Sequence, residues 1–256
     1  MPQPPSSYFS SRRMQLAMGT FVTARASGPS EAANDAAIAA ALNVVAKLNH
    51  SLHPQRLGSD IAAINATTAG TAVSIREATS RLLAITAEVF EASQGIFDPC
   101  LPICDGSFSS IEITRSHVVV HERVSLDMGG IAKGFAVDEA LAVLKLHECQ
   151  SGSVNIGGEV AAFGESETIV MRAIDGSLQT FDLVDEAIAI TDANSSKRPS
   201  EHRGYYQRSD QRLRAREYAA VVAPYAAIAD ALTKCALYCT DDELAPILRR
   251  FRARIV

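Results

Sequence analysis

Strand-like segments in this chain mostly follow one another directly instead of alternating strictly with helices. Apolar alternation and turn residues predict strands over 14–27, 71–75, 110–114, 117–121, 124–126, 153–160, 168–174, 178–183, 187–191 and 218–223. Helical spacing predicts helices over 30–48, 59–65, 82–94 and 131–147, one from about 226, and a last one after Thr240. This order predicts a single α+β domain with mixed or antiparallel sheets and packed helices.

The composition narrows the classes of partner. The 256 residues include 29 acidic and 24 basic side chains, a net charge of −5, so we expect no general attraction for nucleic acid. No segment approaches the roughly 20 apolar residues of a membrane span. Residues 1–13 lack the apolar centre of a signal peptide, so we expect a disordered lead-in before a domain over 14–256. We therefore expect a cytoplasmic protein, or a periplasmic one if a leader was removed.

Residues 125–138 join a strand to a helix through the pair Gly129-Gly130. Glycine allows the positive φ and the close backbone approach that such a turn requires. The first amides of the helix lack intrahelical partners and lie at the positive end of its dipole, which suits an anion such as phosphate. Lys133 could add a charge to the same anion. The alternative is a common tight turn with a solvated lysine, and the glycine spacing is not that of the dinucleotide fingerprint.

A second pair, Gly157-Gly158, interrupts the strand-like segment 153–160. If both turns close over one pocket, one could hold a pyrophosphate while the other lets the backbone approach a flat ring. Asn155 and Glu159 flank this second turn. Their alternative roles are turn capping and sheet-edge polarity, and the residues alone leave both readings open.

Asp230 is a carboxylate in an otherwise apolar helix, with Thr233 on the same face. Burying a carboxylate without a partner is costly, so Asp230 must meet a cation, a donor or a metal. Two such oxygen ligands suit Mg²⁺, which completes its shell with waters and phosphate oxygens. Lys234 offers the competing explanation, because it could neutralise Asp230 in a structural pair.

Taken together and in order, these motifs resemble those of the FAD:protein FMN transferases, the ApbE-like family. The matching segments are Met18-Gly19-Thr20, 59–65, Phe97-Asp98-Pro99, 127–134, 154–158, 222–224 and 229–232. The resemblance implies a T-fold-like α+β domain with FAD in a cleft. It also implies Mg²⁺-dependent transfer of FMN from FAD to a threonine hydroxyl of a partner protein, with release of AMP. The alternatives are an FAD pyrophosphatase that gives FMN and AMP, and a non-catalytic FAD-binding protein.

The resemblance also implies roles for individual residues. By position, the residues expected to contact FAD are Met18, Phe97, Asp98, Gly129, Gly130, Lys133, Phe135, Asn155, Gly157 and Gly158. The metal is expected at the Ala132 carbonyl, Asp230 and Thr233. The expected catalytic residues are His202, as general base for the accepting hydroxyl, and Lys133, which would stabilise the phosphates.

The chain departs from the family pattern in three places. Most members have threonine four residues after the metal-binding aspartate, where this chain has Lys234, and an ammonium could take the place of the ion there. The family's His-Ile-x-Asp-Pro-x-Thr-Gly motif is replaced over 202–209, so only His202 remains. Its Thr-Ser-Gly segment is replaced by Ile190-Thr191-Asp192.

Overall fold

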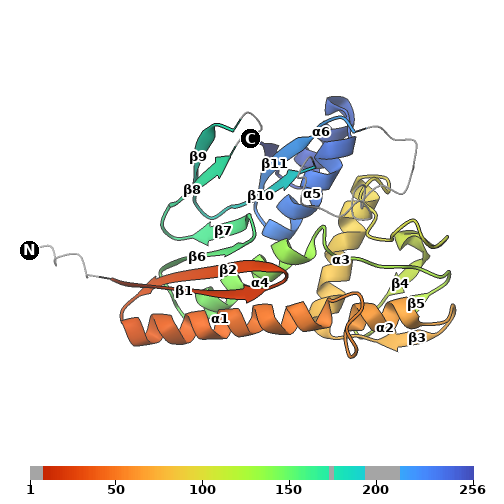
Figure 1. The fold of residues 1–256 in the computed structure, drawn as a ribbon, viewed down its shortest axis with the longest axis horizontal. Coiled ribbons are helices and arrows are strands. Elements are labelled where there is room, and N and C mark those ends of the chain that lie inside the picture. Colours follow the sequence, from red (N-terminus) through yellow and green to blue (C-terminus); the bar gives the residue numbers. More distant parts are fainter. Residues whose placement is uncertain (1–7, 173–175, 194–213) are drawn as a thin grey trace, which may run out of the picture.

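The computed structural model describes residues 8–172, 176–193 and 214–256. A seven-stranded sheet in the order β1-β2-β6-β7-β10-β11-β12 forms its main layer (Figure 1). Every neighbouring pair in this sheet is antiparallel, as the succession of strands in the sequence predicts. Its strands are β1 (Phe9–Ala17), β2 (Thr20–Gly28), β6 (Ser151–Ile156), β7 (Glu159–Phe163), β10 (Ala187–Asp192), β11 (Tyr218–Ala223) and β12 (Arg254–Ile255).

Three helices cover one face of this sheet: α1 (Glu31–Ser51), α4 (Ala132–Leu146) and α5 (Ala226–Tyr238). α4 lies between the other two, because it contacts both α1 and α5, and each helix also contacts strands of the sheet. Figure 1 shows α1 along β1 and β2 and α5 beside β10 and β11. The main core lies between these helices and the sheet.

The remaining elements extend this layered unit. A three-stranded sheet contains β3 (Ala72–Ser74), β5 (His117–Val120) and β4 (Ile111–Ile113), and β8 (Glu167–Arg172) pairs with β9 (Leu178–Leu183). The other helices are α2 (Asp60–Ala66), α3 (Glu77–Ala92), the 3₁₀ turn η1 (Phe108–Ser110) and α6 (Asp241–Arg250). No helix among the described residues is both long and apolar enough to span a bilayer.

Strand β7 is buried on both faces, which fixes where Glu159 points. Ala161 and Phe163 belong to the main core beneath the helices, whereas Val160 and Ala162 belong to a smaller cluster on the opposite face. Because side chains alternate along a strand, Glu159 shares the face of Ala161 and Phe163. The first residue of β7 therefore places a carboxylate against the helical layer.

Several sequence predictions differ from the structure in ways that have a physical reason. Residues 9–13, expected to be part of a disordered lead-in, pair with β2 as the first half of β1. An edge strand with mostly exposed side chains needs no apolar alternation, so its sequence does not resemble a half-buried strand. Residues 124–126 form only an isolated bridge between Leu126 and Cys100, and β3 supplies the third strand beside β5. Helix α6, in contrast, begins at Asp241 directly after Thr240 as predicted, and the capping box of Thr240 and Glu243 fixes its start ahead of Pro246.

Candidate functional site

Two hairpin turns lie side by side at one end of the main sheet. Met18 and Gly19, with φ of +52° and +74°, join β1 to β2 as a two-residue loop. Gly157 and Gly158, with φ of +67° and +112°, join β6 to β7 in the same way. A Cβ atom on Gly157 would lie only 2.8 Å from Thr20 Cγ2, so the two turns are in contact. The structure thus brings together two motifs that are far apart in the sequence.

The turn before α4 uses most of its own amides. Gly129 N donates to the Asp127 carboxylate at 2.7 Å, and the amides of Ile131 and Ala132 donate to the Met128 carbonyl at 3.0 and 2.8 Å. These contacts form the tight turn predicted for the Gly-Gly pair, but neither glycine has the positive φ that the prediction expected. They also leave fewer amides for an anion than the sequence alone suggests, so phosphate binding by this turn stays a prediction.

Lys133 connects this turn to the second Gly-Gly turn. Its Nζ forms an ion pair and hydrogen bond with Glu159 Oε1. Glu159 is 1% exposed, whereas the Lys133 side chain is 28% exposed. The lysine is therefore not a freely solvated side chain. The pair places the first turn of α4 next to the start of β7, as expected if both turns line one pocket.

Burial, and after it the negative charge of Asp230, raise the pKa of the Glu159 carboxyl to about 7, against the lowering effects of Lys133 and Lys234. Its second oxygen, Oε2, is buried and has no hydrogen-bond partner among the described residues. A buried acceptor without a donor is energetically costly. The sequence left open whether Glu159 was merely sheet-edge polarity, and the structure instead makes it part of a buried charged cluster.

Asp230 is completely buried and lies one turn inside α5. Lys234, 3% exposed, forms an ion pair with Asp230 Oδ1 and donates to the Asp230 backbone carbonyl at 3.0 Å. Asp230 Oδ2 accepts from the backbone amide of Gly134 at 3.2 Å. Both carboxylate oxygens thus have donors. The explanation in which Lys234 neutralises Asp230 describes the observed arrangement.

Two further predicted metal ligands lie beside this pair. Thr233 Oγ1 donates to the Asp230 carbonyl at 2.7 Å and lies 2.7 Å from Thr191 Oγ1 on β10. Ala132 is the buried first residue of α4, two positions before Gly134. Thr233 thus contacts Asp230 directly, and Ala132 lies two positions before the glycine whose amide contacts the Asp230 carboxylate.

Gly134 allows α4 and α5 to approach closely at this crossing. A Cβ atom there would lie 2.2 Å from the Ala226 carbonyl oxygen, a distance that no side chain permits. Asp138 of α4 also joins the two helices. Its carboxylate accepts hydrogen bonds from the backbone amides of Ala226 and Ala227, the first residues of α5, at 2.8 and 2.9 Å. Sequence reasoning missed Asp138, although an acidic residue directly after the apolar run Phe135-Ala136-Val137 was the available signal.

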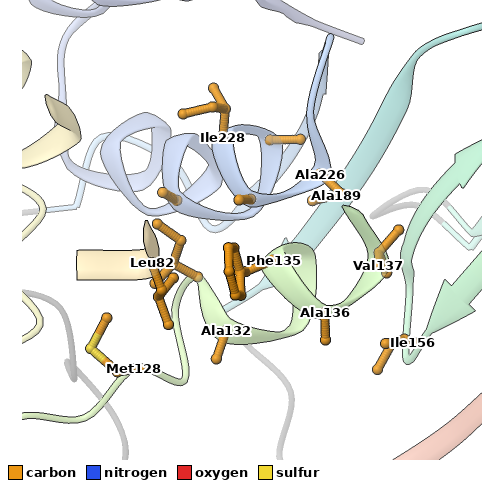
Figure 2. Close-up of a cluster of buried hydrophobic side chains, with 14 of the residues drawn as sticks. Leu82, Met128, Ala132, Phe135, Ala136, Val137, Ile156, Ala189, Ala226 and Ile228 are labelled. Carbon is orange, nitrogen blue, oxygen red and sulfur yellow. The ribbon is translucent and has the colours of Figure 1, made fainter. Parts of the chain in front are cut away.

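Other residues predicted to contact FAD have structural roles. Phe97 and Phe135 are buried in the core, and Figure 2 shows Phe135 between α4 and α5 near Leu82. Asp98 Oδ1 accepts from the amides of Cys100 and Phe108 at 2.8 and 3.3 Å. Contact between these side chains and FAD stays a prediction.

Asn155 is exposed and does not belong to the buried cluster. Asn155 Oδ1 accepts from the Gly158 amide at 3.2 Å, which matches its alternative role as a turn cap. His202, predicted as a general base, lies outside the described residues.

A cavity of about 500 Å³ lies between α3, α4, α5 and residues near the C-terminus. Phe135 and Asp138 contribute to its lining, whereas neither Gly-Gly pair nor the Lys133–Glu159 pair does.

Burial raises the pKa of Asp138 to about 6, against the lowering effect of the two backbone amides that donate to its carboxylate. We place the candidate site at the converging turns, because the charged groups and the motifs meet there.

Comparison with known proteins supports the same fold. The sequence model described as the ApbE family matches residues 18–195, and no curated protein matches the chain. The apo crystal structure of the Pseudomonas stutzeri flavinyl transferase ApbE has a TM-score of 0.80 at 20% identity, covering 95% of this chain and 89% of that one. The flavin transferase ApbE from Vibrio cholerae has a TM-score of 0.77 at 14% sequence identity, covering 97% of this chain and 93% of that one. The ApbE protein from Thermotoga maritima has a TM-score of 0.77 at 20% sequence identity, covering 98% of this chain and 94% of that one. These likenesses confirm the predicted α+β architecture.

Proposed function

Because this chain belongs to the ApbE family, we propose that it is an FAD:protein FMN transferase, which moves FMN from FAD to a threonine of a partner protein and releases AMP. One observation carries the site assignment: the Lys133–Glu159 pair joins the two Gly-Gly turns, and the Met18-Gly19 hairpin lies against the second of them. The family-like motifs thus converge on one buried charged cluster.

The reaction exchanges the phosphoanhydride bond of the FAD pyrophosphate for a phosphoester bond to threonine. The threonine oxygen attacks the phosphorus atom of the FMN half, the bond from that phosphorus to the bridging oxygen breaks, and AMP leaves with that oxygen. The hydroxyl proton passes to a base, for which we propose His202 from its position in the sequence. Such transfers depend on positioning and on neutralising charge, with little covalent help from the protein.

Lys133 is the group best placed to act on the pyrophosphate. It lies in the first turn of α4, and its side chain is partly exposed while its partner Glu159 is buried. The carboxylate holds the ammonium at the mouth of the two turns, where a phosphate could share it. Glu159 is in this respect a positioning residue, and Lys133 supplies the charge that stabilises the transition state.

The resemblance also predicts Mg²⁺ at the Ala132 carbonyl, Asp230 and Thr233. Mg²⁺ requires oxygen ligands at about 2.0–2.1 Å in octahedral geometry. Both Asp230 oxygens are already engaged, one of them by the ammonium of Lys234. Among the described residues, no group of three or more His, Cys, Asp or Glu side chains could hold a metal ion. The donor set does not fit the ion, so the steps above are assigned to the protein's own groups.

The proposal is tested with purified protein, FAD and a synthetic library of threonine-containing peptides. AMP release is followed by chromatography, and covalent flavin by peptide fluorescence under denaturing conditions. AMP together with labelled peptide supports the transferase. AMP with free FMN and unlabelled peptide supports a pyrophosphatase instead. Absence of AMP with FAD in every condition, including added Mg²⁺, contradicts both enzymatic functions and leaves FAD binding alone.

A further inference from the structure

We infer that the ammonium group of Lys234 is the resident cation of the Asp230 site, so that this site does not take the divalent ion that the resemblance predicts. The inference rests on the proposed function, whose charge requirement it assigns to lysines of the chain. Its evidence comes from the contacts of Asp230, from the neighbouring threonines and from the charge of the whole buried cluster.

Each carboxylate oxygen of Asp230 already accepts from a donor of the chain, and the donor at Oδ1 is a cation. Lys234 lies one helical turn further along α5, and its Nζ contacts both Oδ1 and the backbone oxygen of the same aspartate. Gly134 donates to Oδ2. An ion bound at Oδ1 would meet the ammonium at hydrogen-bond distance from the same oxygen. Two cations that share one carboxylate in a buried place repel each other strongly.

The second predicted side-chain ligand is engaged as well. The Thr233 hydroxyl donates to the Asp230 carbonyl, and the Thr191 hydroxyl lies 2.7 Å away. The Asp230 carbonyl thus receives both this hydroxyl and the Lys234 ammonium. The oxygen atoms of this helical turn therefore already contact hydrogen-bond donors of the chain in place of a metal ion.

The surroundings of the pair also disfavour a hydrated ion. Every residue of α5 from Ala226 to Tyr238 is buried. Mg²⁺ gives up its waters reluctantly and usually keeps several of them. The side chain of Lys234 instead delivers its charge on an apolar stem that packs within the helix layer.

Charge balance across the cluster points the same way. Asp230 and Glu159 interact electrostatically, and Glu159 also interacts with Lys133 and Lys234. Two lysines thus oppose two carboxylates, so the buried cluster already contains its counter-charges. A divalent ion would add two positive charges that no buried side chain of this cluster compensates, and isolated buried charge is costly.

The direct test uses Mn²⁺ as a paramagnetic probe for the metal site. The free Mn²⁺ signal is measured by electron paramagnetic resonance as wild-type protein is added, with and without FAD. We expect no loss of signal beyond that caused by FAD alone. Stoichiometric loss of signal that the Asp230→Asn variant abolishes would overturn the inference. The titration of the wild-type protein itself requires neither turnover nor a variant.

The Lys234→Thr variant provides the complementary test, because it restores a hydroxyl four residues after the aspartate. We expect this variant to bind Mn²⁺, to lose AMP release in EDTA and to regain it with Mg²⁺, whereas wild-type AMP release resists EDTA. Lys47→Thr, at an exposed position on α1, is the matched control and should behave as wild type. A folded Lys234→Thr protein that binds no Mn²⁺ would show that Lys234 does not exclude the ion.

Failure of the inference and failure of the proposed function give different results. If no sample releases AMP under any condition, the transferase proposal fails, while the Mn²⁺ titration still decides what occupies the Asp230 site. If wild-type protein releases AMP only with a divalent ion and binds Mn²⁺ through Asp230, the function stands and the inference is wrong.

Discussion

Asp138 and Asp230 each cap the helix to which the other belongs. Asp138 of α4 accepts hydrogen bonds from the first two amides of α5, and Asp230 of α5 accepts one from Gly134 in the first turn of α4. Each carboxylate satisfies amides that a helix N-terminus leaves without partners. The two helices are therefore fixed to each other at the place where Lys133 and Lys234 enter the candidate site.

Replacing Asp138 by Ala should lower the free energy of unfolding by about 1–2 kcal/mol, because two N-terminal amides of α5 lose their acceptor. Urea unfolding followed by circular dichroism measures the change. Asp35→Ala removes an exposed ion pair with Arg13 and should cost at most about 1 kcal/mol. Equal losses of unfolding free energy in the two variants would mean that the cap stabilises the protein no more than an exposed ion pair does.

The pH dependence of this cap has a definite sign. The pKa of Asp138 is raised from 3.8 to about 6 in the folded protein, so the folded state binds its proton more tightly than the unfolded state does. The contribution of Asp138 to stability is then present at low pH and declines as pH rises from about 4 to about 6. The stability difference between wild type and Asp138→Asn should shrink over that range. A difference that grows with pH would show that the pKa is lowered on folding.

Gly134→Ala should destabilise the protein by about 1–3 kcal/mol, because the new methyl group cannot fit against the Ala226 carbonyl without separating the helices. The sign of the stability change is informative, because alanine in a helix interior normally stabilises a protein relative to glycine by about 1 kcal/mol. Ala142→Gly, at an exposed position of α4, measures that propensity in the same helix. Stabilisation by Gly134→Ala would refute the close approach of α4 and α5.

Lys133→Met should reduce the rate of AMP release by about 10²–10³-fold, the usual effect of removing one group that stabilises the transition state. It should also destabilise the protein by about 1–3 kcal/mol, because Glu159 loses its buried partner. The double variant Lys133→Met/Glu159→Gln separates the two effects. It should regain stability without regaining AMP release, and recovery of both would make the lysine merely structural.

Breaking the Asp230–Lys234 pair from one side should be severe. Lys234→Met leaves a buried carboxylate without its cation, which costs about 3–5 kcal/mol in comparable cases. The double variant Asp230→Asn/Lys234→Met removes both charges and should recover most of the loss. Thermal and urea unfolding of the single and double variants form a double-mutant cycle. Additive losses would mean that the two side chains do not interact.

The sequence was most informative where structure is local. The strands Leu178–Leu183 and Tyr218–Ala223 match the predicted ranges, and Ser30 caps α1 through the Ala33 amide as expected. The pair of Asp230 and Lys234 was one of two readings available, because helical periodicity places both on one face. Patterns within one element are thus sufficient to predict its type and its capping residues.

Contacts between distant elements were not predictable in this way. Glu159 was noticed beside a turn, but nothing in its neighbourhood says that Lys133, from another element, lies opposite. Asp138 caps a helix that begins 88 residues later. Periodicity reveals which face of an element is buried, whereas the partner across the core follows only from the arrangement of the sheet and helices.

The most direct test of the proposed function is the fate of flavin when wild-type protein and Lys133→Met are compared in the same assay. Each is incubated with FAD and the threonine-containing peptides, and AMP and covalently bound flavin are quantified together. We predict equal amounts of AMP and flavin-labelled peptide with wild type, and formation of both about 10²–10³-fold slower with Lys133→Met. Wild-type protein that stays bound to intact FAD without releasing AMP, with or without Mg²⁺, would contradict the assignment as a transferase.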